Sequence, residues 1–261
     1  MPDLEKLIEE KLDNGKPHED FRLWLSSDPN PKFPISILQR SIKMTTEPPR
    51  GIKANMLRLY NTIKDTHFNK IEKEKAKYKK LLYSLCWYHS ILIERKKFKS
   101  LGWNIMYAFN DSDFEVCEAI IAMYLGSTDE KNIQVDTKNI PWDAIQYLIG
   151  EVSYGGRVTD ERDRKLMKVY TETFFQSAVV EESKFMLSGG NVPYMIPDDT
   201  NYKLPPDITN PAHFFKMYIK DVNHFPQVER PEAFGQHVNA EIASQRTDTR
   251  ELLASILTLQ P

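Results

Sequence analysis

The sequence has few cysteines and no excess of charge of one sign. Its 261 residues include 2 cysteines, 35 lysines and arginines, and 37 aspartates and glutamates. Cys86 and Cys117 lie in apolar helical patterns and lack zinc-ligand spacing to any histidine. We therefore expect free buried thiols in a reducing compartment, and neither a disulfide framework nor a metal site. A net charge of -2 argues against nucleic acid as a partner, because phosphate binding needs a basic field.

Long apolar runs are also missing. No run reaches the ~18 residues that a membrane span needs, so no membrane partner is expected. The N-terminal stretch "MPDLEKLIEEKLDNGK" is acidic and amphipathic and is not a signal peptide. A hydrophobic share of 41% is still enough to form a core, and the length suggests one to three domains.

Residues 1–49 predict a small α/β segment. "FRLWLSS" (21–27) alternates like a strand, and "ISILQRSIKMTTEPP" (35–49) predicts a short helix followed by a second strand. One or two strands cannot form a stable sheet in water. We therefore expect this segment to be the remnant of a larger α/β domain.

From residue 51 onward the chain is predicted to be mainly α. Apolar residues recur at helical spacing over five segments, and the short connections predict one bundle from about 51 to 180. The segments are 51–63, 69–98, 113–126, 141–150 and 159–176. The lysine-rich run 70–80 is expected to be a solvated helix face rather than a binding patch, since glutamates are mixed into it. The residues expected to point inward from the third helix are Val116, Ile120, Met123 and Tyr124, and Gly126 is expected to end it.

The C-terminal part predicts a linker and further helices. Residues 188–211 are rich in Gly, Pro, Asp and Asn, which is typical of a linker or a loop laid along a surface. A short helix over 211–222 and a final helix over 239–260 follow. The second half of the final helix carries an apolar stripe that needs a partner, made of Leu252, Leu253, Ile256 and Leu257.

The stretch "GEVSYGGR" (150–157) superficially resembles a phosphate-binding loop. That loop needs glycine, four residues and then Gly-Lys-Ser/Thr, between a strand and a helix. Here Gly156 follows Gly155 where lysine belongs, and a helix precedes the stretch. We therefore expect a glycine hinge before a helix capped by Thr159, and no nucleotide cradle.

A dense cluster of charged residues follows this hinge. Two interpretations stay open for it: a solvated helix end, which is the usual case, or an interface, where arginine is enriched. The cluster consists of Arg157, Asp160, Arg162, Asp163 and Arg164.

The stretch "NDSDFEVCEAI" (110–120) looks like a calcium loop but fails its spacing. The positions that need glycine and glutamate hold Val116 and Ala122. Polar residues directly before an apolar helical run predict a helix cap instead, at Asp113 or Ser112.

No catalytic constellation is recognised in the sequence. His89 lies on the apolar face of the long helix, so we expect a buried, neutral, hydrogen-bonded ring rather than a catalytic base. The stretch 94–115, "ERKKFKSLGWNIMYAFNDSDFE", sets aromatic rings beside carboxylates. Such a stretch can line a ligand site or form a rigid connector between two helices, and the helix-cap pattern favours the connector.

Four long stretches, in order across the chain, resemble the C-terminal part of the dynein heavy chain motor. Two of these stretches are "LLYSLCWYHSILIERKKFKSLGWNIMYAFNDSDF" and "IPWDAIQYLIGEVSYGGRVTDERDR". The wording of "KMTTEPPRG" and "PEAFGQHVNAEI" is more similar to axonemal than to cytoplasmic heavy chains. The stretches are 21–60, 81–114, 140–164 and 231–261. One departure is Arg162, where the family's motif has tryptophan in the stretch after "VTD".

The resemblance implies an architecture. Residues 1–49 would be the end of the large α/β subdomain of the sixth AAA+ module, residues 50–185 its helical lid, and residues 186–261 a linker and the start of the C-terminal domain. It also implies the joint: Gly102 lets the chain leave the long helix, Trp103 and Phe109 plug the bundle, and Asp113 starts the next helix.

The resemblance further implies a role without catalysis. The chain would close the AAA+ ring of a minus-end-directed microtubule motor and relay conformational change. It would hold no cofactor itself, since ATP and Mg would bind other modules of the parent. Its partners would be the neighbouring AAA+ modules and the C-terminal domain, with the microtubule reached only through the parent, in the axoneme of a cilium or flagellum. The alternative is a free-standing helical adaptor that binds a partner helix.

Overall fold

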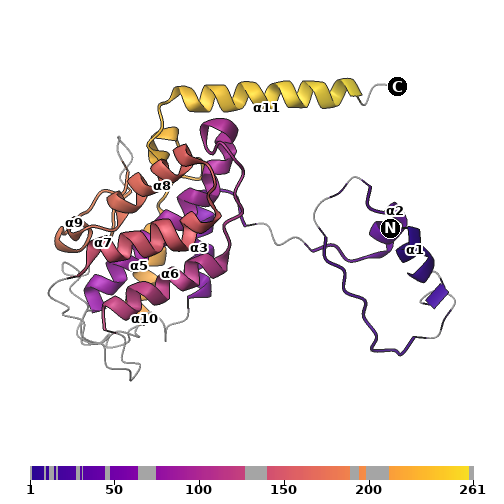
Figure 1. The fold of residues 1–261 in the computed structure, drawn as a ribbon, viewed down its shortest axis with the longest axis horizontal. Helices are drawn as coiled ribbons and strands as arrows, with labels where there is room; N and C mark the ends of the chain where they lie inside the picture. Colours follow the sequence, from indigo (N-terminus) through magenta and orange to yellow (C-terminus); the bar gives the residue numbers. More distant parts are fainter. Residues whose placement is uncertain are drawn as a thin grey trace. The chain divides into compact units, whose positions relative to one another are not determined.

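The computed structural model describes two compact units, Met1–Pro48 and Pro49–Pro261. Each is described by itself (Figure 1). The residues that the structure describes are 2–8, 10–11, 15, 17–27, 30, 32–44, 48–63, 75–126, 140–188, 194–197 and 212–258.

The first unit contains two short helices. They are α1 (Pro2–Ile8) and α2 (Ile35–Arg40). Residues 21–27 and 41–44 belong to neither helix nor strand, so the strands predicted there are wrong as far as the chain is described. Residues 45–47 lie outside the described residues. The physical reason is pairing: a strand exists only when its backbone N–H and C=O groups meet those of a neighbour.

The second unit is a helical bundle, which confirms the mainly α fold class. Among the described residues its β pairing is limited to an isolated bridge between Met186 and Met195. Its elements are α3 (Ile52–Thr62), α5 (Lys75–Glu94), η2 (Arg95–Leu101), α6 (Asp111–Tyr124), α7 (Trp142–Gln146), η3 (Tyr147–Tyr154), η4 (Gly155–Arg157), α8 (Glu161–Phe174), α9 (Ser177–Glu181), α10 (Ala212–Asn223), η6 (Pro231–Phe234) and α11 (Asn239–Thr258).

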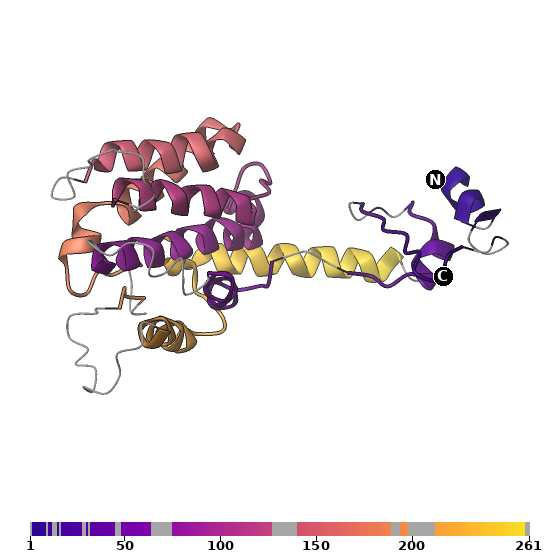
Figure 2. The same cartoon turned by 90° about the horizontal axis from the view of Figure 1, so that it is seen from below.

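Helix α5 forms the centre of the bundle. It is buried on nearly all sides from Tyr78 to Ile93, as expected for a helix whose apolar stripe runs almost all round. Helices α3, α6, α8 and α9 pack against it (Figures 1 and 2). Residues 69–74, which the sequence adds to this helix, lie outside the described residues.

Two lysines near the start of α5 are buried, so the predicted solvated face is wrong for them. Only 3% of Lys79 and 8% of Lys80 are exposed. Lys80 Nζ donates to Val180 O at 3.0 Å and to Glu182 O at 2.7 Å. These carbonyls lie at the C-terminal end of α9, where the helix dipole favours a positive charge.

The predicted inward face of α6 is wrong for two of its four residues: Tyr124 packs against the core and Ile120 is half-buried, but Val116 and Met123 are exposed. Val116 and Met123 are 52% and 43% exposed. Gly126 follows the last turn with a φ of 83°, as predicted for the residue that ends this helix. Apolar residues lie almost all round α6, so its periodicity does not select one face. The residues that it buries include Phe114, Cys117, Ile121 and Ala122.

The start of α3 is held by a residue from the C-terminal part of the same unit. Gly51 precedes α3 with a φ of 100°, a conformation that favours glycine. Because glycine has no capping side chain, Glu229 takes that place: Ile52 N donates to its Oε1 at 2.6 Å. Lys97 Nζ lies 3.4 Å from the other carboxylate oxygen of Glu229.

Helix α11 extends beyond the bundle in both views (Figures 1 and 2). None of its residues is buried, and its predicted apolar stripe is exposed. Of the predicted linker 188–211, only Ser188 and residues 194–197 are described. Tyr194 is 1% exposed and packs on the buried Trp87 with ring centroids 4.7 Å apart, so this part of the predicted linker belongs to the core rather than to a surface loop.

Candidate functional site

The joint, residues 102–113, begins with a backbone turn that excludes a side chain. Gly102 N and Trp103 N both donate to Lys99 O at 2.9 Å. Gly102 has an ordinary φ of -85°, but a Cβ placed on it would lie 1.9 Å from Arg95 O. The structure therefore requires glycine here because of space rather than because of backbone angle.

Trp103 fills the space between the end of α5 and the rest of the joint. It is 1% exposed, and its indole Nε1 donates to Leu92 O at 3.1 Å. Its ring meets Tyr107 edge-on at a centroid distance of 5.6 Å and Phe109 at 5.8 Å. Phe109 is buried in turn against Tyr154, 5.6 Å away. These rings pack against one another, and the joint presents a filled core.

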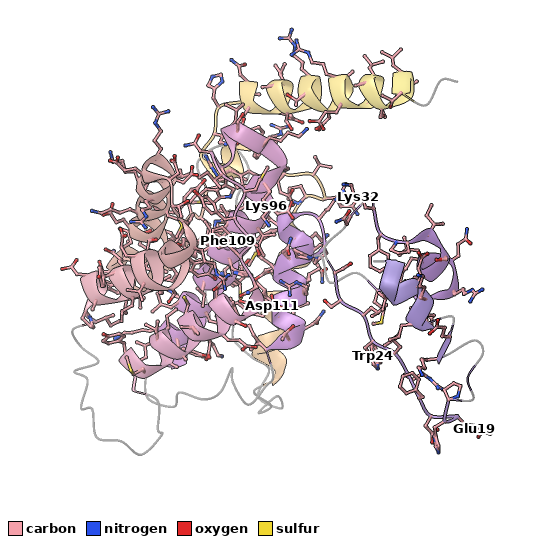
Figure 3. All side chains as sticks on the ribbon, turned by 45° about the vertical axis from the view of Figure 1, so that its right-hand side comes forward. Glu19, Trp24, Lys32, Lys96, Phe109 and Asp111 are labelled. Carbon is pink, nitrogen blue, oxygen red and sulfur yellow. The ribbon has the colours of Figure 1, made fainter. Side chains whose placement is uncertain are left out.

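Asn110, not Asp113 or Ser112, caps α6. Its side chain accepts a hydrogen bond from Asp113 N, and the Asp113 carboxylate accepts one from Asn110 N at 3.0 Å. This reciprocal pair is a capping box, in which the residue three positions after the cap returns the bond. Asp113 thus helps to start α6 from its first turn. Figure 3 labels Phe109 in the joint and Asp111, the first residue of α6.

The predicted hinge forms the end of an unusual helix. Residues 147–154 make a π-helix, and Gly155, Gly156 and Arg157 close it with one 3-10 turn. A Cβ on Gly155 would lie 2.4 Å from Gly150 O, whereas Gly156 has open space around it. π-Helical turns are rare and often mark functional positions.

The joint and the hinge, 44 to 56 residues apart in sequence, meet in space. Arg157 Nε pairs with Asp113 Oδ1 at 3.0 Å. Asn104 Nδ2 donates to Asp160 Oδ1 at 3.0 Å. The hydrogen bond from Asn104 holds the pKa of the Asp160 carboxyl below its usual value.

Asp160, not Thr159, caps α8. Its carboxylate accepts from Arg162 N at 2.9 Å and Asp163 N at 3.1 Å. Arg162, the departure from the family motif, is itself exposed. Several cap-competent residues stand in a row here, and the sequence does not say which one satisfies the orphan N–H groups of the helix.

The contacts of Asp163 with the joint were not predicted from the sequence. Asp163 is 4% exposed, and its carboxylate accepts hydrogen bonds from Asn104 N at 3.1 Å, Ile105 N at 3.3 Å and Tyr107 Oη at 2.9 Å. The prediction placed it in a charge cluster. Its spacing from Asp160 could have indicated a helix start, but its partners come from 56 to 59 residues away, which spacing does not reveal.

A buried arginine connects the joint to the C-terminal part of the bundle. Arg95 Nε donates to Gly102 O at 2.6 Å, and Nη1 donates to Phe234 O at 2.9 Å and to the Tyr170 hydroxyl. Tyr170 Oη donates to the same Phe234 O at 2.5 Å. Burial lowers the pKa of Arg95. Its guanidinium fork thus joins η2, α8 and η6 at one point.

Comparison with known proteins identifies the family of this chain. The family model of the dynein heavy chain AAA lid domain matches residues 78–240, which is more than half of the chain. The chain belongs to the dynein heavy chains. The model of the dynein heavy chain region D6 P-loop domain matches residues 1–45. The resemblance stated from the sequence is therefore confirmed.

Individual dynein heavy chains match over the full length of this chain. Dynein axonemal heavy chain 2 of Mus musculus is 48% identical over 261 residues, and the dynein-1-beta heavy chain of the flagellar inner arm I1 complex of Chlamydomonas reinhardtii is 46% identical. Dynein axonemal heavy chain 1 of Mus musculus is 39% identical. The chain covers 100% of its own length in each match but only 5–6% of the relative.

The buried histidine and the two cysteines of this dynein lid lie among packed core residues. His89 is fully buried, and its Nδ1 lies 2.7 Å from the Tyr154 hydroxyl. Burial lowers the pKa of His89 to about 4, which confirms the neutral ring. Cys86 and Cys117 are free and buried, as predicted. Within the described ranges, no group of three or more His, Cys, Asp or Glu residues is placed to hold a metal ion, and no helix is long and apolar enough to cross a membrane.

Proposed function

We propose that this chain is a non-catalytic lid segment of a dynein microtubule motor. It would close the AAA+ ring and pass conformational change between neighbouring modules during ATP-driven, minus-end-directed movement. The proposed division is residues 1–49 for the end of the large subdomain, 50–185 for the lid, and 186–261 for the linker and the start of the C-terminal domain. ATP and Mg would bind other modules, and the axonemal relatives favour a place in a cilium or flagellum.

The observation that carries this proposal is the hydrogen-bonded lock at Asp163. A module that passes movement must shift as a rigid body, because packed elements move between discrete arrangements rather than deform. Asp163 fixes the joint through Asn104, Ile105 and Tyr107, while the Arg157–Asp113 pair closes the other side. With this lock, α5, α6 and α8 would move together.

Substitution of Asp163 in a full-length heavy chain tests the relay. Asp163→Ala leaves the buried Tyr107 hydroxyl without its acceptor, at a cost of about 1–3 kcal/mol, and also removes the acceptor of the Asn104 and Ile105 amides. We expect microtubule gliding to slow while ATP hydrolysis continues, because the lid no longer moves as one body. Glu161→Gln is the matched control, since Glu161 is an exposed acid of the same helix and pairs with Lys165 on the helix surface. Gliding at wild-type speed in the Asp163→Ala motor would contradict the relay.

Nucleotide titration of the chain alone tests the assignment of ATP to other modules. We expect no tight binding of ATP in calorimetry, with or without Mg²⁺, because "GEVSYGGR" departs from the phosphate-binding loop. Micromolar binding that Arg157→Ala abolishes would overturn this part of the proposal.

The alternative, a free-standing adaptor, is favoured by one observation. Four apolar side chains near the end of α11, from Leu252 to Leu257, are between 47% and 68% exposed. Such a stripe can lie in the groove of a partner helix pair. The match to heavy chains over the whole sequence favours the motor segment instead.

A further inference from the structure

Lys99 has an unusual backbone conformation. Its φ is 50° and its ψ is -125°, and it is the one non-glycine residue with positive φ among the described parts of the chain. Side chains with a Cβ rarely adopt this conformation, because the Cβ crowds the neighbouring backbone. Residues held in this way persist only where surrounding contacts fix them, and they often mark switches.

The contacts that fix Lys99 come from two directions. Its carbonyl oxygen accepts from Gly102 N and Trp103 N, and so forms the turn that opens the joint. Its ammonium group lies 3.0 Å from Asp248 Oδ1 and 2.7 Å from Glu251 Oε1, both on α11. One strained residue therefore joins α11 to the backbone of the joint.

Helix α11 is docked by polar contacts at the protein surface. No residue of α11 is buried, and both carboxylates that meet Lys99 are more than 60% exposed. Another contact of α11 with η2 is a hydrogen bond from Ser244 Oγ to Lys97 O at 3.0 Å, and Ala240 in the first turn of α11 packs, half-buried, against the core. Exposed ion pairs are weak and are screened by salt, so this docking is reversible.

We propose that Lys99 is a strained latch that couples the docking of α11 to the turn at Gly102 and Trp103. While α11 is docked, the two ion pairs hold Lys99 at positive φ and keep its carbonyl in the turn. When α11 leaves, the Lys99 backbone relaxes and the carbonyl moves away from the two amides. The coupling is a property of this chain and goes beyond the proposed motor role.

Hydrogen exchange of the 261-residue chain tests the latch. The variant Asp248→Asn/Glu251→Gln removes both ion pairs and leaves Lys99 in place. We expect amides of α11 and also those of Gly102 and Trp103 to exchange about three- to tenfold faster, the range that two exposed ion pairs can supply.

The variant Glu161→Gln/Glu172→Gln is the control for charge. It neutralises two exposed carboxylates of α8 that pair with lysines of the same helix, and it changes the net charge by the same amount. We expect wild-type exchange at Gly102 and Trp103 in this variant. Faster exchange there to the same extent as in the α11 variant would overturn the proposal, because net charge would then explain the effect.

The substitution Lys99→Gly separates the strain from the ion pairs. Glycine adopts positive φ without crowding but offers no ammonium group. We expect α11 to exchange as fast as in the Asp248→Asn/Glu251→Gln variant, while Gly102 and Trp103 keep wild-type protection. Equal loss of protection at Gly102 and Trp103 in both variants would show that strain does not couple them. Faster exchange confined to α11 in the Asp248→Asn/Glu251→Gln variant would likewise overturn the latch.

Discussion

The substitution Trp103→Ala tests whether the joint is a packed connector. The indole is 1% exposed, lies among the rings of Tyr107 and Phe109, and donates a hydrogen bond to Leu92 O. Truncation of such a side chain leaves a cavity, which costs about 3–5 kcal/mol for a large aromatic residue. A domain of this kind is held by only about 5–15 kcal/mol, so the bundle should lose a large share of its stability.

Urea denaturation followed by circular dichroism measures this loss. Trp103→Phe keeps a ring but removes the N–H donor, and we expect a loss of about 1–3 kcal/mol, smaller than for alanine. Val116→Ala, a change at an exposed position of α6, is the control and should stay within about 0.5 kcal/mol of wild type. A denaturation midpoint for Trp103→Ala equal to that of the wild type would refute the packed joint and restore the ligand-site interpretation of residues 94–115.

Two further predictions concern the buried surroundings of the joint. The unfolded chain binds a proton at His89 near pH 6.5, whereas burial lowers the pKa of His89 in the folded chain to about 4. Between these values the unfolded chain binds more protons than the folded chain. The free energy of unfolding should therefore fall by about 2 kcal/mol from pH 6.5 to about pH 5. His89→Gln should lack this part of the slope, and an unchanged pH profile in that variant would contradict the buried neutral ring. At Gly150 an added Cβ would lie 2.6 Å from Thr171 Oγ1. Gly150→Ala should therefore lower the melting temperature, because overpacking costs about 1–3 kcal/mol and outweighs the helix preference of alanine. Gly156→Ala is the control, since an added Cβ there meets open space, and it should not lower the melting temperature. Equal melting temperatures of the two variants would contradict the close approach of η3 and α8.

The helices of the bundle could be predicted because their signals are local. Apolar periodicity, Gly126 at a helix end and the all-round apolar pattern of α5 each depend on residues within a few turns. The prediction of the helix caps was wrong where several neighbouring residues could accept the same backbone hydrogen bonds. The caps at Asn110 and Asp160 each stand beside other cap-competent residues, and geometry alone selects between them.

The contacts between distant segments could not be predicted. The sequence places Asp163 in a cluster of charged residues, but its hydrogen-bond donors come from the joint. Lys80 reads as a solvated lysine, yet two carbonyls at the end of α9 surround its ammonium group. In each case a charged residue is buried because a partner from far along the chain satisfies it, and no local pattern records that partner. The strand prediction for 21–27 is wrong because a partner is absent where the pattern requires one. The segment has the alternating pattern of a strand but meets no neighbouring strand in the described part of its unit.

The carboxylate that caps α3 sets an order of events during synthesis. Ile52 and Glu229 are 177 positions apart, so the ribosome must add the whole bundle before the first turn of α3 receives its acceptor. Chains fold as they emerge, and a helix start without its partner frays. The N-terminal turn of α3 is therefore expected to be among the last parts of this unit to become ordered, and a ribosome-stalled chain that ends before residue 229 should contain a formed α5 beside a frayed beginning of α3.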